Sequence, residues 1–106
     1  MTRLTFAHLI SISALFGAVT AAHANEALAN KYACAACHQA DHKLVGPAWK
    51  EVAVKYADGS VTPAQLAVII RKGSSGKWGW MAMLAQSQLP QADAQALAAW
   101  VLQGTK

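Results

Sequence analysis

Residues 34–38 read CAACH and hold both cysteines of the 106-residue chain, Cys34 and Cys37, with His38 directly after the second one. Three chemistries use residues of this kind: a redox-active dithiol, a zinc site and the covalent attachment of a haem. A structural disulfide is a poor explanation, because a bridge across two intervening residues closes a very small loop and constrains the unfolded chain little. The rest of the chain has to decide among the three chemistries.

The N-terminal residues 1–24 have the layout of a secretory signal peptide. Arg3 gives a positive start, a mostly apolar stretch follows over residues 4–19, and residues 22–24 read AHA, a pattern that signal peptidase accepts. An uncleaved membrane anchor is the alternative, but serines, threonines and a histidine interrupt a run that should contain about 20 strongly apolar residues. We therefore expect cleavage after residue 24, export to the periplasm and no stable membrane insertion of the mature domain, residues 25–106.

The mature part is short and mildly basic. Cleavage would leave 82 residues, enough for one small domain. A core of this size usually needs a disulfide, a metal or a bound group to stabilise it. Eight Lys and Arg residues against five Asp and Glu residues, with no basic run, argue against nucleic-acid binding and permit docking on an acidic protein surface.

The mature sequence predicts four helices and no strand. We expect the first helix to begin at a cap on Asn25 and to run into the cysteine pair. A second helix is expected within residues 48–59, where apolar side chains form a stripe. The third, within residues 62–73, starts with a Thr-Pro-x-Gln capping box and ends at a glycine. The fourth spans residues 90–104, and the stretch between the last two helices is expected to be a long loop.

This helical setting favours one of the three chemistries. A redox dithiol normally starts a helix that follows a strand, and no strand is predicted. Zinc needs four ligands in a structural site, and His42 is the only further histidine of the mature chain. Haem attachment needs only the residues present: Cys34 and Cys37 bond to the vinyl groups of one porphyrin, and His38 lies beneath the iron as an axial ligand. We therefore predict one covalently attached haem c.

The long loop offers two candidates for the other face of the iron, Met81 and Met83. A methionine among aromatic residues is often only core filler, although two in one loop favour a ligand. His42 lies four residues after His38 and is expected on the same side of the haem, facing solvent. A His/Met pair raises the reduction potential and closes both axial positions, which favours electron transfer over substrate chemistry.

Three further segments follow CAACH in an order and at a spacing similar to those of a known family. They read KLVGPAWKEVAVKYA at residues 43–57, GSSGKWGWMAM at residues 73–83 and LAAWVLQ at residues 97–103. With them, the mature chain resembles the small bacterial class I cytochromes c of the c-551 type along nearly its whole length. The resemblance implies an all-α fold in which about four short helices wrap around one covalently bound haem.

The resemblance also implies roles for the residues around the proximal ligand. Cys34 and Cys37 would form the thioether bonds, and His38 would bind the iron. The carbonyl of Pro47 would fix the orientation of the His38 ring, as the partners of such ligands commonly do.

On the opposite side, the resemblance implies that Trp78 donates a hydrogen bond to a haem propionate. The family's ligand methionine follows that tryptophan by five residues, which selects Met83 over Met81. Trp100 would pack in the C-terminal helix against the N-terminal one. The family's ligand loop is rich in proline around the methionine, whereas alanine, leucine and tryptophan stand here, so the loop should be softer and the Met–iron bond easier to break.

Taken together, these features predict a monomeric, periplasmic one-electron carrier and not an enzyme. Its donor would be a membrane cytochrome complex, and its acceptor a terminal oxidase or reductase, in small and transient encounters. Four lysines could surround the exposed haem edge and steer these encounters: Lys31, Lys43, Lys72 and Lys77. The alternative is a haem protein that releases its methionine and acts as a peroxidase-like enzyme or gas sensor, although no distal His or Arg is identifiable.

Overall fold

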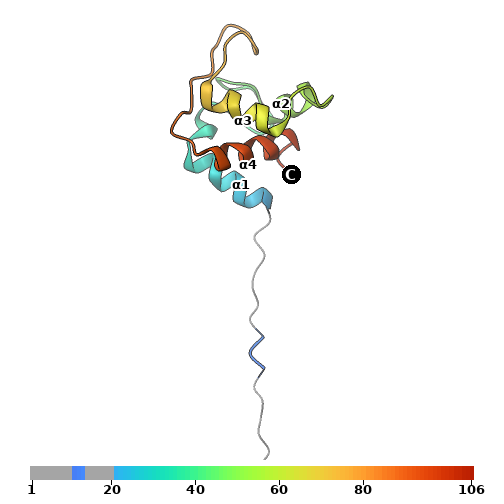
Figure 1. The fold of residues 1–106 in the computed structure, drawn as a ribbon. Coiled ribbons are helices and arrows are strands. Elements are labelled where there is room, and N and C mark those ends of the chain that lie inside the picture. The colour runs from blue at the N-terminus through green and yellow to red at the C-terminus, as the bar shows by residue number, and fades with distance from the viewer. Residues whose placement is uncertain (1–10, 14–20) are drawn as a thin grey trace, which may run out of the picture.

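The computed structural model describes residues 11–13 and 21–106, and most of the expected signal peptide, residues 1–10 and 14–20, lies outside the described residues (Figure 1). Four helices make up the fold: α1 Ala21–Lys31, α2 Trp49–Lys55, α3 Pro63–Lys72 and α4 Gln91–Leu102. In the described part of the chain, extended segments pair only at two isolated bridges, so the all-α prediction is confirmed.

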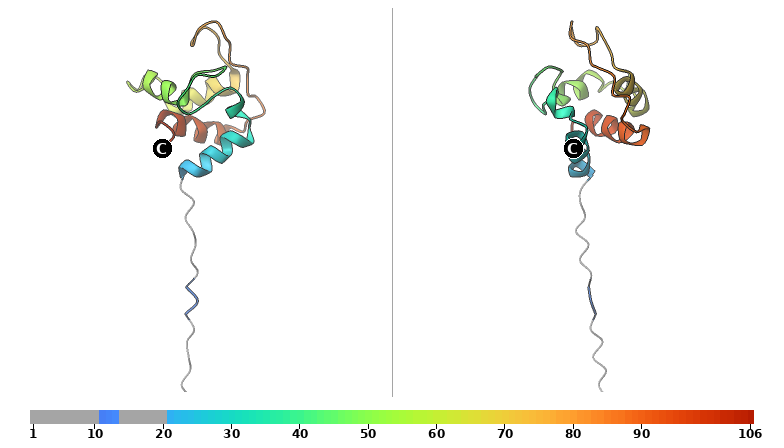
Figure 2. Two further views of the ribbon diagram at one scale, coloured as in Figure 1. Left: turned by 180° about the vertical axis from the view of Figure 1, so that it is seen from behind. Right: turned by 90° about the vertical axis from the view of Figure 1, so that its left-hand side faces the viewer.

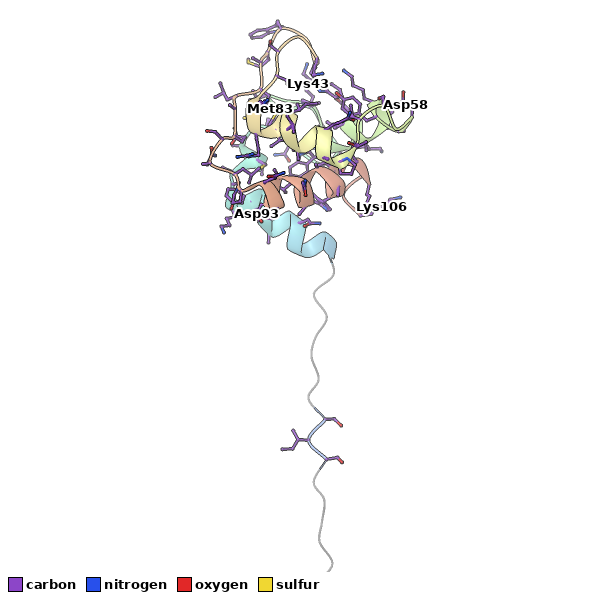
Figure 3. The ribbon with its side chains drawn as sticks, viewed as in Figure 1. Lys43, Asp58, Met83, Asp93 and Lys106 are labelled. Atoms are coloured by element: carbon purple, nitrogen blue, oxygen red, sulfur yellow. The ribbon has the colours of Figure 1, made fainter. Side chains whose placement is uncertain are left out.

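Helix α4 lies at the centre of the fold and packs on α1, α2 and α3 (Figures 1 and 2). Its inward side is apolar and buried: Ala94, Leu97, Ala98, Trp100 and Val101. Removing these side chains from water stabilises the folded domain. At the edge of this core the Tyr32 hydroxyl donates a 2.7 Å hydrogen bond to Asp93, and this bond raises the pKa of Tyr32. Figure 3 labels Asp93 at the start of α4.

The expected end of the first helix is wrong, whereas its expected start at Asn25 refers to the chain after cleavage. In the full chain α1 begins at Ala21 and not at Asn25, because the alanine-rich segment before Asn25 has a high helix propensity. The helix ends at Lys31, and Ala33 adopts a left-handed conformation with φ of 58°. The cysteine pair therefore lies on a separate 3₁₀ turn, Cys34–Ala36, and not on the helix itself.

The ends of α3 agree with the sequence prediction. The side chain of Thr62 accepts a 3.2 Å hydrogen bond from the backbone N–H of Gln65, and the Gln65 side chain accepts a 2.9 Å bond from the backbone N–H of Thr62. Pro63 occupies the first turn, and Gly73 ends the helix with φ of 77°. Because both signals are local, they determine this helix independently of the rest of the fold.

The long loop between α3 and α4, residues 73–90, projects from the helical body (Figures 1 and 2). Its base is fixed by the Arg71 side chain, which donates a 3.0 Å hydrogen bond to the carbonyl of Leu89, and by a 3.2 Å bond from the Gln86 N–H to the Ile70 carbonyl. Among the described residues, no helix has both the length and the apolar character needed to cross a membrane.

Replacing Thr62 by alanine removes the capping interaction of α3. We expect the free energy of unfolding to fall by about 1 kcal/mol, because one backbone N–H of the first turn loses its acceptor. Urea denaturation of the holoprotein measures this change, and Thr62→Ser, which keeps the hydroxyl, is the control. Equal stability of the wild type and Thr62→Ala would show that the cap does not stabilise the folded state.

Candidate functional site

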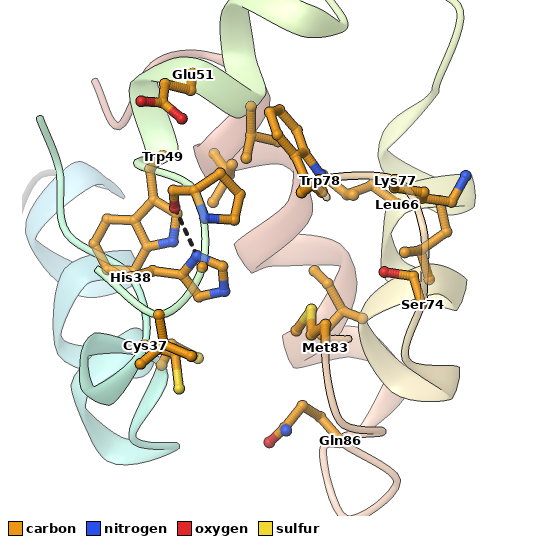
Figure 4. Close-up of a pocket in the computed structure, with 18 of the residues that line it drawn as sticks. Cys37, His38, Trp49, Glu51, Leu66, Ser74, Lys77, Trp78, Met83 and Gln86 are labelled. Atoms are coloured by element: carbon orange, nitrogen blue, oxygen red, sulfur yellow. Dashed lines mark hydrogen bonds between the residues drawn. The ribbon is translucent and has the colours of Figure 1, made fainter. Parts of the chain in front are cut away.

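A cavity of about 420 Å³ opens between the 3₁₀ turn, the three later helices and the long loop (Figure 4). All of the sequence-predicted site residues line it: Cys34, Cys37, His38, Pro47, Trp78 and Met83, together with Met81. Much of the remaining wall is apolar, with Val52, Leu66, Ile69, Ile70 and Leu97 among its residues. Both the volume and the apolar lining are typical of a site for a large organic ligand.

The orientation of the His38 ring is set by the loop that follows it. Its Nδ1 lies 2.8 Å from the carbonyl oxygen of Pro47. Because a carbonyl only accepts, Nδ1 must carry the proton, and Nε2 keeps its lone pair free to bind a metal. The Trp49 ring stacks on the imidazole at 6.3 Å between ring centroids and an interplanar angle of 20°. His42 is exposed, as expected.

Gly46 is a site residue that sequence reasoning missed. A Cβ atom at this position would lie 2.6 Å from Cε1 and 3.0 Å from Nδ1 of His38. Gly46 is not among the glycines with positive φ, so the close approach of the ring, and not the backbone conformation, requires glycine here. Only its position before Pro47 could have drawn attention to it.

The two cysteines differ in exposure. Cys34 is half-buried and Cys37 is exposed, and the Cys34 carbonyl accepts hydrogen bonds from the N–H groups of Cys37 and His38 at 3.1 and 3.0 Å. Burial raises the pKa of the Cys34 thiol, whereas reactive dithiols have a lowered pKa. In the described part of the chain no group of three or more His, Cys, Asp or Glu residues is placed to hold a metal ion. Neither a dithiol nor a zinc site is supported.

Met83 lies on the opposite wall and faces His38 across the cavity (Figure 4). Its backbone exchanges two hydrogen bonds with Ser74, of 2.8 and 3.1 Å, which close the base of the loop. Gly73 permits this approach, since a Cβ atom there would lie 2.6 Å from the Met83 carbonyl oxygen. Met83 is half-buried, whereas Met81 is exposed to 43%.

Two tryptophans line other parts of the cavity. Trp78 makes an edge-to-face contact with Tyr56, with ring centroids 6.4 Å apart. Trp100 is buried in the same core cluster as Ala29 of α1, and its ring centroid also lies 4.9 Å from that of Trp49 of α2. The buried Nε1 of Trp100 finds no acceptor in the described residues.

The residues present fit a covalently attached haem. Two cysteine thiols followed by an imidazole with a free Nε2 are the groups that covalent haem c attachment uses, a methionine thioether lies on the opposite wall, and the cavity between them is largely apolar. A group with carboxylate oxygens could also supply an acceptor for a buried indole N–H. Of the four lysines expected around the edge, all are exposed, but only Lys43 and Lys77 line the cavity.

Comparison with known proteins agrees with this chemistry. A family model described as cytochrome C oxidase, cbb3-type, subunit III matches residues 20–101. Cytochrome c-552 of Nitrosomonas europaea is 48% identical over 81 residues, which cover 76% of this chain and 79% of the relative. Cytochrome c-551 of Pseudomonas aeruginosa is 44% identical over 77 residues, or 73% of each chain. The crystal structure of wild-type Nitrosomonas europaea cytochrome c552 superposes with a TM-score of 0.71 at 47% identity, over 74% of this chain and 96% of that one.

Replacing Gly46 by alanine tests how tightly the His38 ring is packed. The added methyl group would overlap the imidazole, so we expect a loss of roughly 1–3 kcal/mol in the free energy of unfolding of the holoprotein, measured by urea denaturation. Gly59→Ala is the control, because its Cβ would meet no atom within 4 Å, although the positive φ there carries its own cost. A smaller loss of unfolding free energy in Gly46→Ala than in Gly59→Ala would contradict the proposed packing of the His38 ring.

Proposed function

The chain belongs to the family of small bacterial class I cytochromes c of the c-551 type and carries one covalently attached haem c, and we propose that it is a periplasmic electron carrier whose iron is bound by His38 and Met83. The main support for this ligation is the placement of these two side chains on facing walls of one cavity, next to both cysteines. The named relatives are cytochromes c-551 and c-552, in agreement with an electron-carrying role.

Each residue has a distinct part in this proposal. Cys34 and Cys37 form the thioether bonds, and Nε2 of His38 binds the iron. The Pro47 carbonyl accepts the hydrogen bond that His38 Nδ1 donates, which fixes the ring and leaves the lone pair on Nε2. The haem supplies the exchange of one electron between the ferrous and ferric states. Trp78 is the proposed donor to a propionate.

Met83 is proposed to close the second axial position. Its backbone is fixed by Ser74 at the base of the loop, whereas Met81 lies two residues further out and is more exposed. If His38 and Met83 both bound the iron, substrates and gases would find no open site on it, which would favour electron transfer over catalysis.

The proposed partners are redox proteins in the periplasm: a membrane cytochrome complex as donor and a terminal oxidase or reductase as acceptor. Lys43 and Lys77 at the cavity mouth are suited to meet an acidic partner surface, since charges at the rim of an interface mainly accelerate association. Encounters of this kind are short-lived. The proposed free form is a monomer.

The ligand assignment is tested by replacing each methionine in turn. Met83→Ala should abolish the weak red charge-transfer band that marks methionine sulfur on ferric haem, and it should lower the reduction potential, because the Met ligand raises it. Met81→Ala is the matched control, two residues away in the same loop, and should keep both properties. The opposite pattern would assign the ligand to Met81.

Export and haem attachment are tested by the intact mass of the purified holoprotein. We expect the mass of residues 25–106 plus one haem, with no free thiol left to react with an alkylating reagent. Cleavage at this point would remove the first four residues of α1, Ala21 to Ala24. A mass that retains residues 1–24 would mean that the leader stays attached as an anchor.

A further inference from the structure

Lys55 makes an unusual set of contacts for an exposed lysine. It is the last residue of α2, and its Nζ donates a 2.6 Å hydrogen bond to the carbonyl oxygen of Lys77 in the long loop. The same Nζ lies 4.1 Å from the centroid of the Trp78 ring and 5.9 Å from that of Tyr56. The ammonium group is therefore held between the end of a helix and the loop.

These contacts join the two walls of the cavity. Helix α2 starts at Trp49, whose ring stacks on His38, so the helix belongs to the proximal wall. Trp78 belongs to the loop that carries Met83 on the opposite wall. Lys55 thus connects the element that supports one proposed ligand to the segment that presents the other.

The outer part of the loop is held by Trp78, which packs against the hydrophobic core and the Tyr56 ring, and by the contacts of Lys55. The bonds of Ser74 with Met83 and of Gln86 with Ile70 all lie at its base. Among the described residues, the bond from Lys55 is the one hydrogen bond that connects residues 75–82 to the helices. The cation–π contact with Trp78 adds to it, since a lysine within about 6 Å of an indole face is attracted by the ring.

We propose that Lys55 is a positioning residue that holds the loop against α2 and so keeps Met83 on the iron. The proposal rests on the ligation by His38 and Met83 proposed above. Lys55 does not touch the iron; it acts through Trp78 and the Lys77 carbonyl. The contact matters because residues 75–89, the segment around Met83, contain no proline that would stiffen the loop.

The test measures the affinity of imidazole for the ferric holoprotein. Imidazole displaces Met83 from the iron, and the loss of the red charge-transfer band monitors this displacement. In Lys55→Met, which keeps the length and apolar stem of the side chain, we expect imidazole to bind about tenfold more tightly, because the cation–π contact and the hydrogen bond are lost together. Lys55→Arg should return the affinity to nearly that of the wild type, since a guanidinium retains both contacts.

Lys31→Met is the matched control, because it removes the same charge and a cation–π contact, that of Lys31 with Tyr32 at 5.4 Å, away from the loop. It should leave imidazole binding unchanged. Any of three results would overturn the proposal. The imidazole affinity of Lys55→Met could equal that of the wild type, the affinity of Lys31→Met could rise as much as that of Lys55→Met, or Lys55→Arg could fail to restore the wild-type affinity. If the wild type itself lacked the methionine band, the proposed ligation by His38 and Met83 would be contradicted instead. The two proposals can therefore be contradicted separately.

Discussion

The hydrogen bond between Nδ1 of His38 and the carbonyl of Pro47 is the interaction on which the site depends. It fixes the tautomer of the imidazole and leaves Nε2 as the only ring nitrogen able to bind iron. The surrounding residues serve the same purpose: Gly46 leaves space for the ring, and Trp49 stacks on it. One short stretch of chain directly before and at the start of α2 therefore determines the geometry of the proximal wall.

The opposite wall is constructed differently. Met83 lies on a projecting loop whose base is closed by Ser74 and whose outer part contacts the helices through Lys55 and Trp78. Two large apolar side chains of this loop, Trp80 and Leu84, are exposed to 89% and 78% and add nothing to the core. The wall that carries Met83 therefore has fewer buried contacts than the wall that carries His38, and the proposed carrier function requires it to stay closed.

Local signals in the sequence were sufficient for much of the fold. The capping box of α3, its glycine stop and the long loop after it were predictable because each depends on neighbouring residues. CAACH together with the predicted helical setting and the lack of further zinc ligands was sufficient to predict the cofactor. The end of α1 was not predictable, since nothing in an alanine indicates a left-handed conformation at position 33. The roles of Gly46 and Lys55 were also missed, because both arise from contacts that only the folded chain brings together.

The most direct test of this account is a redox titration of the purified wild-type holoprotein, followed by its visible spectrum at neutral pH. The account predicts a single one-electron transition, a low-spin spectrum in both oxidation states, and a red charge-transfer band that disappears on reduction in step with that transition. A high-spin ferric spectrum, or a low-spin spectrum without the methionine band, would contradict the claim that His38 and Met83 together close the iron.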